Sequence, residues 1–134
     1  MLNSEKIGNE FYQNLGKLYY AMAMTDGIVR PSEVRRLRKY VRQHWLDIDG
    51  MEDEFGTDSA FQIEIVFDWL QNEEKEGNEY FSDFAEFYKD QPKKFGPKVR
   101  KLIIETADSI ASSFAGKNKS EIEFLQQLKD LLGN

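Results

Sequence analysis

Four carboxylates in this sequence are spaced in a way that could hold a metal ion. Asp26 lies in the stretch AMAMTDGIVRPSE, directly before Gly27, and Glu33 follows seven residues later. Glu64 and Asp68 are four residues apart, a spacing that places two side chains on the same face of a helix. Hard divalent cations prefer carboxylate oxygens as ligands. The candidate metal ligands are therefore Asp26, Glu33, Glu64 and Asp68.

Each pair also has a purely structural interpretation, which we favour. An aspartate such as Asp26 can accept backbone N–H groups in a turn, and a glutamate such as Glu33 in the first turn of a helix interacts favourably with the helix dipole. Glu64 and Asp68 are expected to pair with arginines of a neighbouring helix. A metal-dependent enzyme would require all four acids to converge in one cleft.

Other residue patterns point away from enzyme chemistry. The chain has no cysteine, its single histidine, His44, follows no zinc-ligand spacing, and its nine glycines are scattered as turn residues. The stretch DIDGMEDEFGTD departs from the EF-hand template, because Glu52 occupies the glycine position and Asp58 the position of the bidentate glutamate. We expect no catalytic activity and no cofactor beyond a candidate divalent cation.

Length and composition predict one globular domain over residues 1–134. The chain has a mass of 15.7 kDa, and 40% of its residues are apolar, which is enough to bury a core without disulfides. The sequence shows no run of roughly 18 apolar residues and no basic region followed by an apolar stretch near its start. Together with the lack of cysteine, these features lead us to expect a cytoplasmic protein.

The charge pattern disfavours a nucleic-acid partner. The formal net charge is −6, whereas phosphate contacts require a basic surface. Six basic residues between 30 and 42 precede six acidic residues between 47 and 58, so we expect internal compensation and mainly local roles for Arg35, Arg38 and Arg42. The alternative is a helical DNA-binding regulator that uses this basic segment.

A second basic cluster lies between residues 93 and 101. We expect a solvated face, although lysines beside Phe95 could dock on an anionic membrane surface.

Apolar residues recur at helical spacing along the chain, and the alternation typical of strands is scarce. Pro31 and Pro97 suit the first position of a helix, and Asn118 with Glu121 forms a capping-box pattern. We predict an all-α fold of about six helices, over residues 4–25, 31–45, 59–72, 79–90, 97–114 and 119–132.

The third predicted helix is apolar around most of its circumference. It therefore should lie at the centre of the bundle, with Phe61 and Trp69 in the core.

The helical hairpins at the two ends of the chain look alike. In the first, a helix ending in small residues reaches Gly27 and then Glu33; in the second, a similar helix reaches Gly116 and then Glu121. The spacing differs by one residue, and Ala115 stands where the first copy has Asp26. The pattern indicates a weak duplication in which any acidic chemistry belongs to one copy.

These hairpins resemble the first and closing hairpins of the TerB-like (tellurite-resistance) family. The first match rests on Asp26-Gly27, Pro31 and Glu33, and the second on ADSIASSFAGKNKSEIEFLQQL. The stretch DEFGTDSAFQIEIVFDWL is similar to the middle of small TerB-like proteins from bacteria of the Bacteroidetes type. The resemblance covers the whole chain.

The resemblance implies a compact bacterial helical domain, linked to stress response or tellurite resistance, that binds metal through acidic residues and serves in assemblies near the membrane. It implies no enzyme activity, and Ala115 argues against two metal sites. We therefore predict a noncatalytic binding or scaffold module with a protein partner. The sequence does not specify that partner, the ligand or the oligomeric state.

Overall fold

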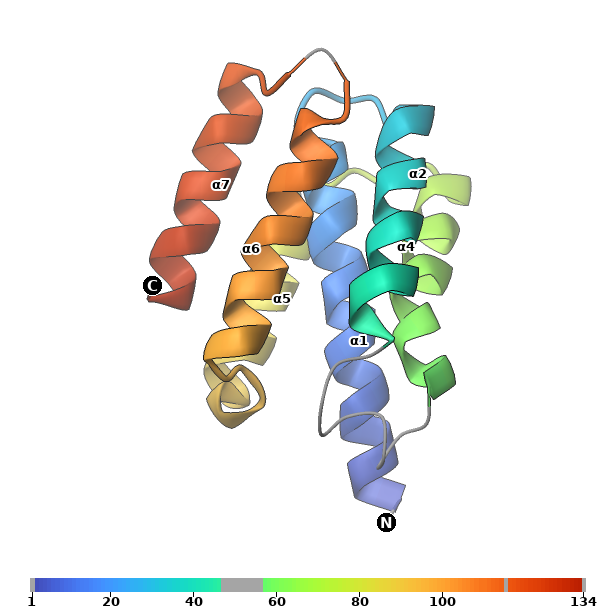
Figure 1. The fold of residues 1–134 in the computed structure, drawn as a ribbon, viewed down its shortest axis with the longest axis vertical. Coiled ribbons are helices and arrows are strands. Elements are labelled where there is room, and N and C mark those ends of the chain that lie inside the picture. Colours follow the sequence, from blue (N-terminus) through green and yellow to red (C-terminus); the bar gives the residue numbers. More distant parts are fainter. Residues whose placement is uncertain (1, 47–56, 115, 134) are drawn as a thin grey trace.

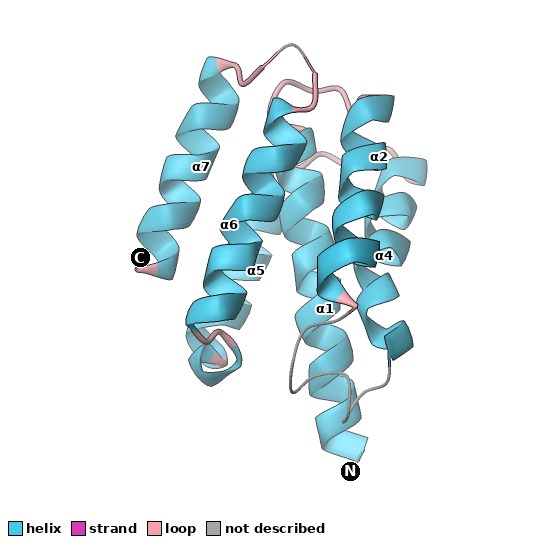
Figure 2. Cartoon of the chain, in the orientation of Figure 1, coloured by secondary structure: helices cyan, strands magenta, loops and turns pink. Residues whose placement is uncertain are grey.

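The computed structural model describes residues 2–46, 57–114 and 116–133, and within these ranges the regular secondary structure is all helical. The prediction of about six α-helices is confirmed (Figures 1 and 2). The helices are α1 (Leu2–Ala23), α2 (Pro31–Tyr40), α4 (Gln62–Asn72), α5 (Asn78–Asp90), α6 (Pro97–Ser112) and α7 (Lys119–Leu132).

Helix α1 is the central element of the bundle and packs against α4, α5 and α6. Helix α4 approaches it most closely at Gly16, where an added Cβ would lie 2.7 Å from the carbonyl oxygen of Ile63. The fully buried side chains of α1 are Phe11, Leu15, Leu18, Tyr19, Met22 and Ala23. The small residues at the end of α1 thus allow its neighbours to pack closely around it.

The sequence-based prediction that the third helix is central is wrong. Helix α4 covers one side of α1 and lies at the edge of the bundle in Figure 1, so only one of its faces is buried. Trp69, which we expected in the core, is 54% exposed, and the ammonium of Lys75 lies 5.8 Å from its ring centroid. Phe61, which we also expected in the core, is only partly buried and packs against the core from outside.

The second predicted helix ends at Trp45 as expected, but its last turn is widened. Helix α2 continues directly into a π-helical turn, Val41–Trp45. This turn places the Trp45 indole in the core, where its N–H donates to the hydroxyl of Thr106 on α6 (3.1 Å). A 3₁₀ turn, Thr57–Phe61, leads into α4.

The turns of the two terminal hairpins lie at the same end of the bundle (Figure 1). Gly27 and Gly116 have positive φ values of 86° and 80°, a conformation that glycine adopts without strain. Helix α2 packs on α6, and α6 packs on α7, so the first turns of α2 and α7 are held near each other.

None of the helices in the described part of the chain combines the length and the apolar character that crossing a bilayer requires.

Candidate functional site

A pocket of about 200 Å³ lies between the two hairpin turns. We call it the paired-turn pocket; its lining side chains come from the turn after α1 and the starts of α2 and α7, together with the end of α6. The described lining residues are Asp26, Arg30, Glu33, Phe114, Gly116, Lys117, Asn118 and Glu121.

Two buried glutamates occupy matching places in this pocket. Oε1 of Glu33 accepts the backbone N–H of Arg30 (2.8 Å), and Oε1 of Glu121 accepts the backbone N–H of Asn118 (2.9 Å). Each glutamate therefore satisfies an N–H group at the start of its own helix. Within the described residues, the donors observed for these two carboxyl groups are therefore backbone N–H groups and not cationic side chains.

The two hairpin turns differ in the group that accepts the backbone N–H of the glutamate. In the second hairpin the side-chain oxygen of Asn118 accepts the N–H of Glu121 (2.8 Å), so the predicted capping box is complete. In the first hairpin the residue before the helix is Arg30, and its backbone carbonyl accepts the N–H of Glu33 (2.9 Å). The side chain of Arg30 is thus available for another role.

Asp26 and Arg30 both line the pocket and contact each other. Asp26 accepts the N–H of Ile28 (3.2 Å), which is the turn that the sequence predicted, and pairs with the Arg30 guanidinium (3.0 Å). The same guanidinium lies 4.4 Å from the centroid of the Phe114 ring, an arrangement that favours a cation. Asp26 is therefore committed to the turn and to Arg30.

The residues Glu33 and Glu121 are only 2% and 4% exposed, and this burial disfavours the ionised forms of their carboxyl groups. Burial raises the pKa of Glu33 to about 7; the negative charges of Glu121 and Asp26 add to the rise, while the N–H and guanidinium of Arg30 oppose it. Burial also raises the pKa of Glu121, against the opposing N–H of Asn118. Sequence reasoning recognised Glu121 only as a helix cap, although its match to Glu33 in the repeat was the available signal.

The other candidate pair, Glu64 and Asp68, is held by arginines from α2 and from the π-helical turn that follows it, as the sequence predicted. Arg38 pairs with Asp68 (3.0 Å), and Arg42 pairs with Glu64 (3.3 Å). Arg38 Nε also lies 3.8 Å from Glu64. Burial raises the pKa of Glu64, whereas the charges of Arg42 and Arg38 oppose that rise.

The four predicted ligands do not share one pocket. Asp26 and Glu33 line the paired-turn pocket, whereas Glu64 and Asp68 lie with the arginines of α2. Although three carboxylates line the paired-turn pocket, the described residues contain no group of three or more His, Cys, Asp or Glu side chains placed to hold a metal ion. The described residues therefore do not form the single cleft of four acids that the alternative, a metal-dependent enzyme, would require.

A second, more apolar hollow adjoins the paired-turn pocket. Its volume is about 370 Å³, and it shares Arg30 and Phe114 with that pocket. We call it the apolar hollow; its lining residues are Ile28, Val29, Arg30, Pro31, Ser32, Arg35 and Phe114. Ile28 and Phe114 are large apolar side chains that are 57% and 52% exposed. One end of the bundle therefore combines buried carboxyl groups with exposed apolar surface.

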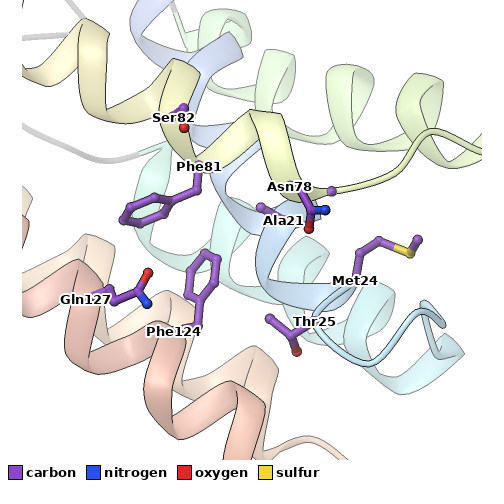
Figure 3. A pocket seen from close by; sticks show the side chains of 9 residues that line it. Ala21, Met24, Thr25, Asn78, Phe81, Ser82, Phe124 and Gln127 are labelled. Carbon is purple, nitrogen blue, oxygen red and sulfur yellow. The ribbon is translucent and has the colours of Figure 1, made fainter.

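A third hollow of about 350 Å³ lies between the end of α1, the start of α5, and α7. Figure 3 shows Phe81 and Phe124 facing each other on one side of it, with Met24 and Thr25 on the other. The two phenyl rings meet edge to face, with centroids 5.2 Å apart. None of its described lining residues is titratable, so we do not place the functional site there.

The basic segment of α2 is largely engaged with other helices. Besides the ion pairs of Arg38 and Arg42, Arg36 donates to the hydroxyl of Ser109 on α6 (2.6 Å). Arg35 is exposed and lines the apolar hollow. The local role predicted for Arg38 and Arg42 is confirmed. The acidic partners predicted between 47 and 58, and the rejected EF-hand loop, lie outside the described residues and side chains.

The second basic cluster lacks the apolar contact that we had assigned to it. Phe95 is only 4% exposed, and its ring centroid lies 5.2 Å from that of Phe11 and 4.9 Å from that of Tyr88. It is a core residue, so the suggestion that Phe95 assists membrane docking is wrong.

Comparisons with protein-family models, with curated proteins and with solved structures found no match to this chain. The resemblance to the TerB-like family therefore stays a prediction, and the site must be interpreted from its own chemistry.

Proposed function

We propose that this chain is a noncatalytic binding or scaffold module, and that its binding surface is the end of the bundle where the two hairpin turns meet. The observation that carries the proposal is the pairing of two adjoining hollows across the Arg30–Phe114 stack. One hollow is lined by buried carboxyl groups, and the other by exposed apolar side chains. Protein interaction sites combine an apolar centre with polar groups in this way.

The engagement of the polar side chains supports a noncatalytic role. A pKa near 7 would suit Glu33 for acid–base catalysis, but Oε1 already caps a helix. No described residue that lines the paired-turn pocket is a serine, threonine, cysteine or histidine that could act as a nucleophile. Glu64 and Asp68 are occupied by arginines. Binding therefore fits these residues better than a reaction does.

The resemblance to TerB-like proteins supports a wider context for the module. It supports a role in a bacterial stress response of the tellurite-resistance type, with a protein as partner, and the lack of cysteine supports a cytoplasmic location. A divalent cation at Asp26 and Glu33 is the second candidate ligand, favoured by the three carboxylates that line one pocket.

Site-specific photocrosslinking in the native cell tests where the partner binds. A photoreactive residue would replace Ile28 at the paired turns or, as a matched control, Ile65 on α4; these side chains are 57% and 54% exposed. We expect a discrete crosslinked protein with the probe at Ile28 and none with the probe at Ile65. Crosslinking only from Ile65, or from neither position, would contradict the proposed surface.

A further inference from the structure

The paired-turn pocket is lined by two buried carboxyl groups whose observed partners are backbone N–H groups and not cations. Glu33 and Glu121 are only 2% and 4% exposed. A buried carboxylate is costly unless a cation or further donors accompany it. The pocket therefore favours a positively charged guest.

The two cations at the rim are already engaged elsewhere. The Arg30 guanidinium pairs with Asp26 and stacks on Phe114. The Lys117 ammonium is 2.8 Å from a carboxylate oxygen of Asp108, which is not among the residues lining the pocket. Within the described residues, the partners observed for Glu33 and Glu121 are backbone N–H groups and not these two cations.

The apolar hollow specifies what should lie next to the cation. It begins on the other side of the Arg30–Phe114 stack and presents Ile28, Pro31 and Phe114. A ligand that spans both hollows therefore needs a positive charge and an apolar group side by side. Two neighbouring residues of a polypeptide meet this requirement.

We propose that the paired-turn end binds a segment of a partner protein in which a lysine or arginine stands beside an aliphatic residue. The cationic side chain enters the paired-turn pocket between Glu33 and Glu121, and the aliphatic side chain occupies the apolar hollow. This inference rests on the proposed function and identifies the chemistry of its partner. A lysine ammonium group has three N–H donors and an arginine guanidinium group has five, so either one can donate hydrogen bonds to both carboxyl groups.

A polypeptide cation suits the pocket better than a metal ion does. Ca²⁺ takes six to eight oxygen ligands, whereas one oxygen of each of the two glutamates already accepts a helix-cap N–H group. A metal ion would also leave the adjoining apolar surface of Ile28 and Phe114 exposed. The side chain of a basic residue neutralises the carboxyl groups while its own chain carries an apolar neighbour into the second hollow.

Such binding must be coupled to proton release. Burial raises the pKa of Glu33 to about 7, so a proton competes with the cationic guest below that pH. The charged groups that face Glu33 are Glu121 and Asp26, which disfavour its ionisation, and Arg30, which favours it; Lys117 acts on Glu121. We expect the affinity to rise from pH 6 to pH 8 by about tenfold, the limit set by one competing proton over roughly one pH unit below its pKa.

Binding of short peptides to the whole chain tests the proposal. The probe is a hexapeptide with a central Lys-Leu pair in a Gly/Ser background; the controls replace Lys by Glu or Leu by Ser. Binding would be followed by amide chemical shifts at pH 6 and pH 8. We expect saturable shifts at residues 26–35 and 114–121 for the Lys-Leu peptide, tighter at pH 8, and at least fivefold weaker binding of both controls.

Variants of the protein separate the carboxyl pair from general negative charge. The double variant Glu33→Gln, Glu121→Gln keeps an oxygen at each helix cap and should lose about tenfold in affinity together with the pH dependence. Glu64→Gln alters a carboxyl group that is buried elsewhere, and should bind as the unchanged protein does. Ile28→Ser should weaken binding while retaining the pH dependence.

Two results would overturn the proposal: equal binding by the double variant and the unchanged protein, or equal binding of the Lys-Leu and Lys-Ser peptides. Shifts confined to other helices would also exclude it. If crosslinking at Ile28 captures a partner while none of the peptides binds, the peptide chemistry is wrong and the proposed function stands. If neither experiment gives a signal, both fail.

Discussion

Two regions of this bundle bury glutamates, and they compensate them differently. Between α2 and α4, Glu64 is accompanied by the guanidinium groups of Arg42 and Arg38. At the paired turns, Glu33 and Glu121 accept backbone N–H groups and face the same pocket. Burial is similar in the two regions, so the difference lies in the neighbours. In the first region arginine side chains compensate the carboxylate, whereas in the second region the observed partners are backbone N–H groups.

The pKa directions follow from that difference. Burial raises the pKa of both Glu64 and Glu33, but the charges of Arg42 and Arg38 oppose the rise at Glu64. At Glu33 a second carboxyl group adds to it. A carboxylate between arginines remains structural near neutral pH, and a carboxylate beside another carboxylate becomes sensitive to pH.

Removing the arginines should leave Glu64 buried without an ion pair, as Glu33 and Glu121 are among the described residues of the paired turns. In the double variant Arg38→Met, Arg42→Met the apolar stems are kept while Glu64 loses both cations. Breaking a buried pair costs about 3–5 kcal/mol, and because both arginines are about half exposed we expect about 2–3 kcal/mol in urea unfolding at pH 7.5.

The matched control for this double variant is Arg35→Met, Lys39→Met, which removes two exposed cations from the same helix. We expect it to change the unfolding free energy by less than about 0.5 kcal/mol. Equal losses in the two double variants would show that Glu64 gains nothing specific from its arginines.

Removing the charge of Glu33 should raise the free energy of unfolding, whereas removing the two arginines should lower it. Its folded-state pKa of about 7 lies above the ordinary value of 4.5, so the stabilisation that protonation provides is complete below pH 4.5 and is lost as the pH rises through 7. Glu33→Gln removes this loss and keeps the cap acceptor. We expect the variant to be about 1–2 kcal/mol more stable than the unchanged protein at pH 8, and equally stable at pH 4.

Chemical unfolding across this pH range measures the effect, and Glu123→Gln is the control because Glu123 is an exposed glutamate of α7. A parallel pH dependence of the unchanged protein and Glu33→Gln would show that Glu33 does not titrate in this range.

The helices could be predicted from sequence because their end signals are local. Pro31, Pro97 and the Asn118–Glu121 box lie where α2, α6 and α7 begin. The burial of a helix is not local, since it depends on how many neighbours cover it. Trp69 shows this: α4 carries apolar residues on several faces, yet α1 covers only one, and the tryptophan is half exposed.

For the candidate site, too, the local features could be predicted from sequence and the non-local ones could not. The i, i+4 spacing of Glu64 and Asp68 sufficed to expect ion pairs with arginines of a neighbouring helix, and the structure identifies these arginines as Arg38 and Arg42. The meeting of Glu33 with Glu121 was not predicted, because it depends on two turns 88 positions apart in the chain packing at one end of the bundle. A repeat in the sequence says that two segments are alike, but not that they are adjacent.

Removing Arg30 should affect the paired turns less than removing arginines affects the α2–α4 region. In Arg30→Met the backbone N–H that binds Glu33 is retained, and the lost pair with Asp26 is partly exposed. We expect a loss of about 0.5 kcal/mol, as for other surface pairs, and a Glu33 pKa that stays near 7 by carbon-detected NMR titration. A large rise in that pKa would mean that the guanidinium, and not the backbone, controls Glu33.

The smallest effect is expected on adding divalent cations. Their binding would neutralise the carboxylates of the paired-turn pocket. Asp26 is engaged by Arg30 and by a backbone N–H, and Glu33 by its cap, so too few oxygens remain for a hard cation. Calorimetric titration with Ca²⁺, Mg²⁺ and Mn²⁺ should give dissociation constants of about 1 mM or weaker, at the weak end of known calcium modules. The variant Asp26→Asn, Glu33→Gln should give the same weak signal. Micromolar binding that this variant abolishes would show instead that the carboxyl groups leave their turn contacts for a metal ion, and the contrast between the two glutamate regions would then be one between arginine and metal as the neutralising partner.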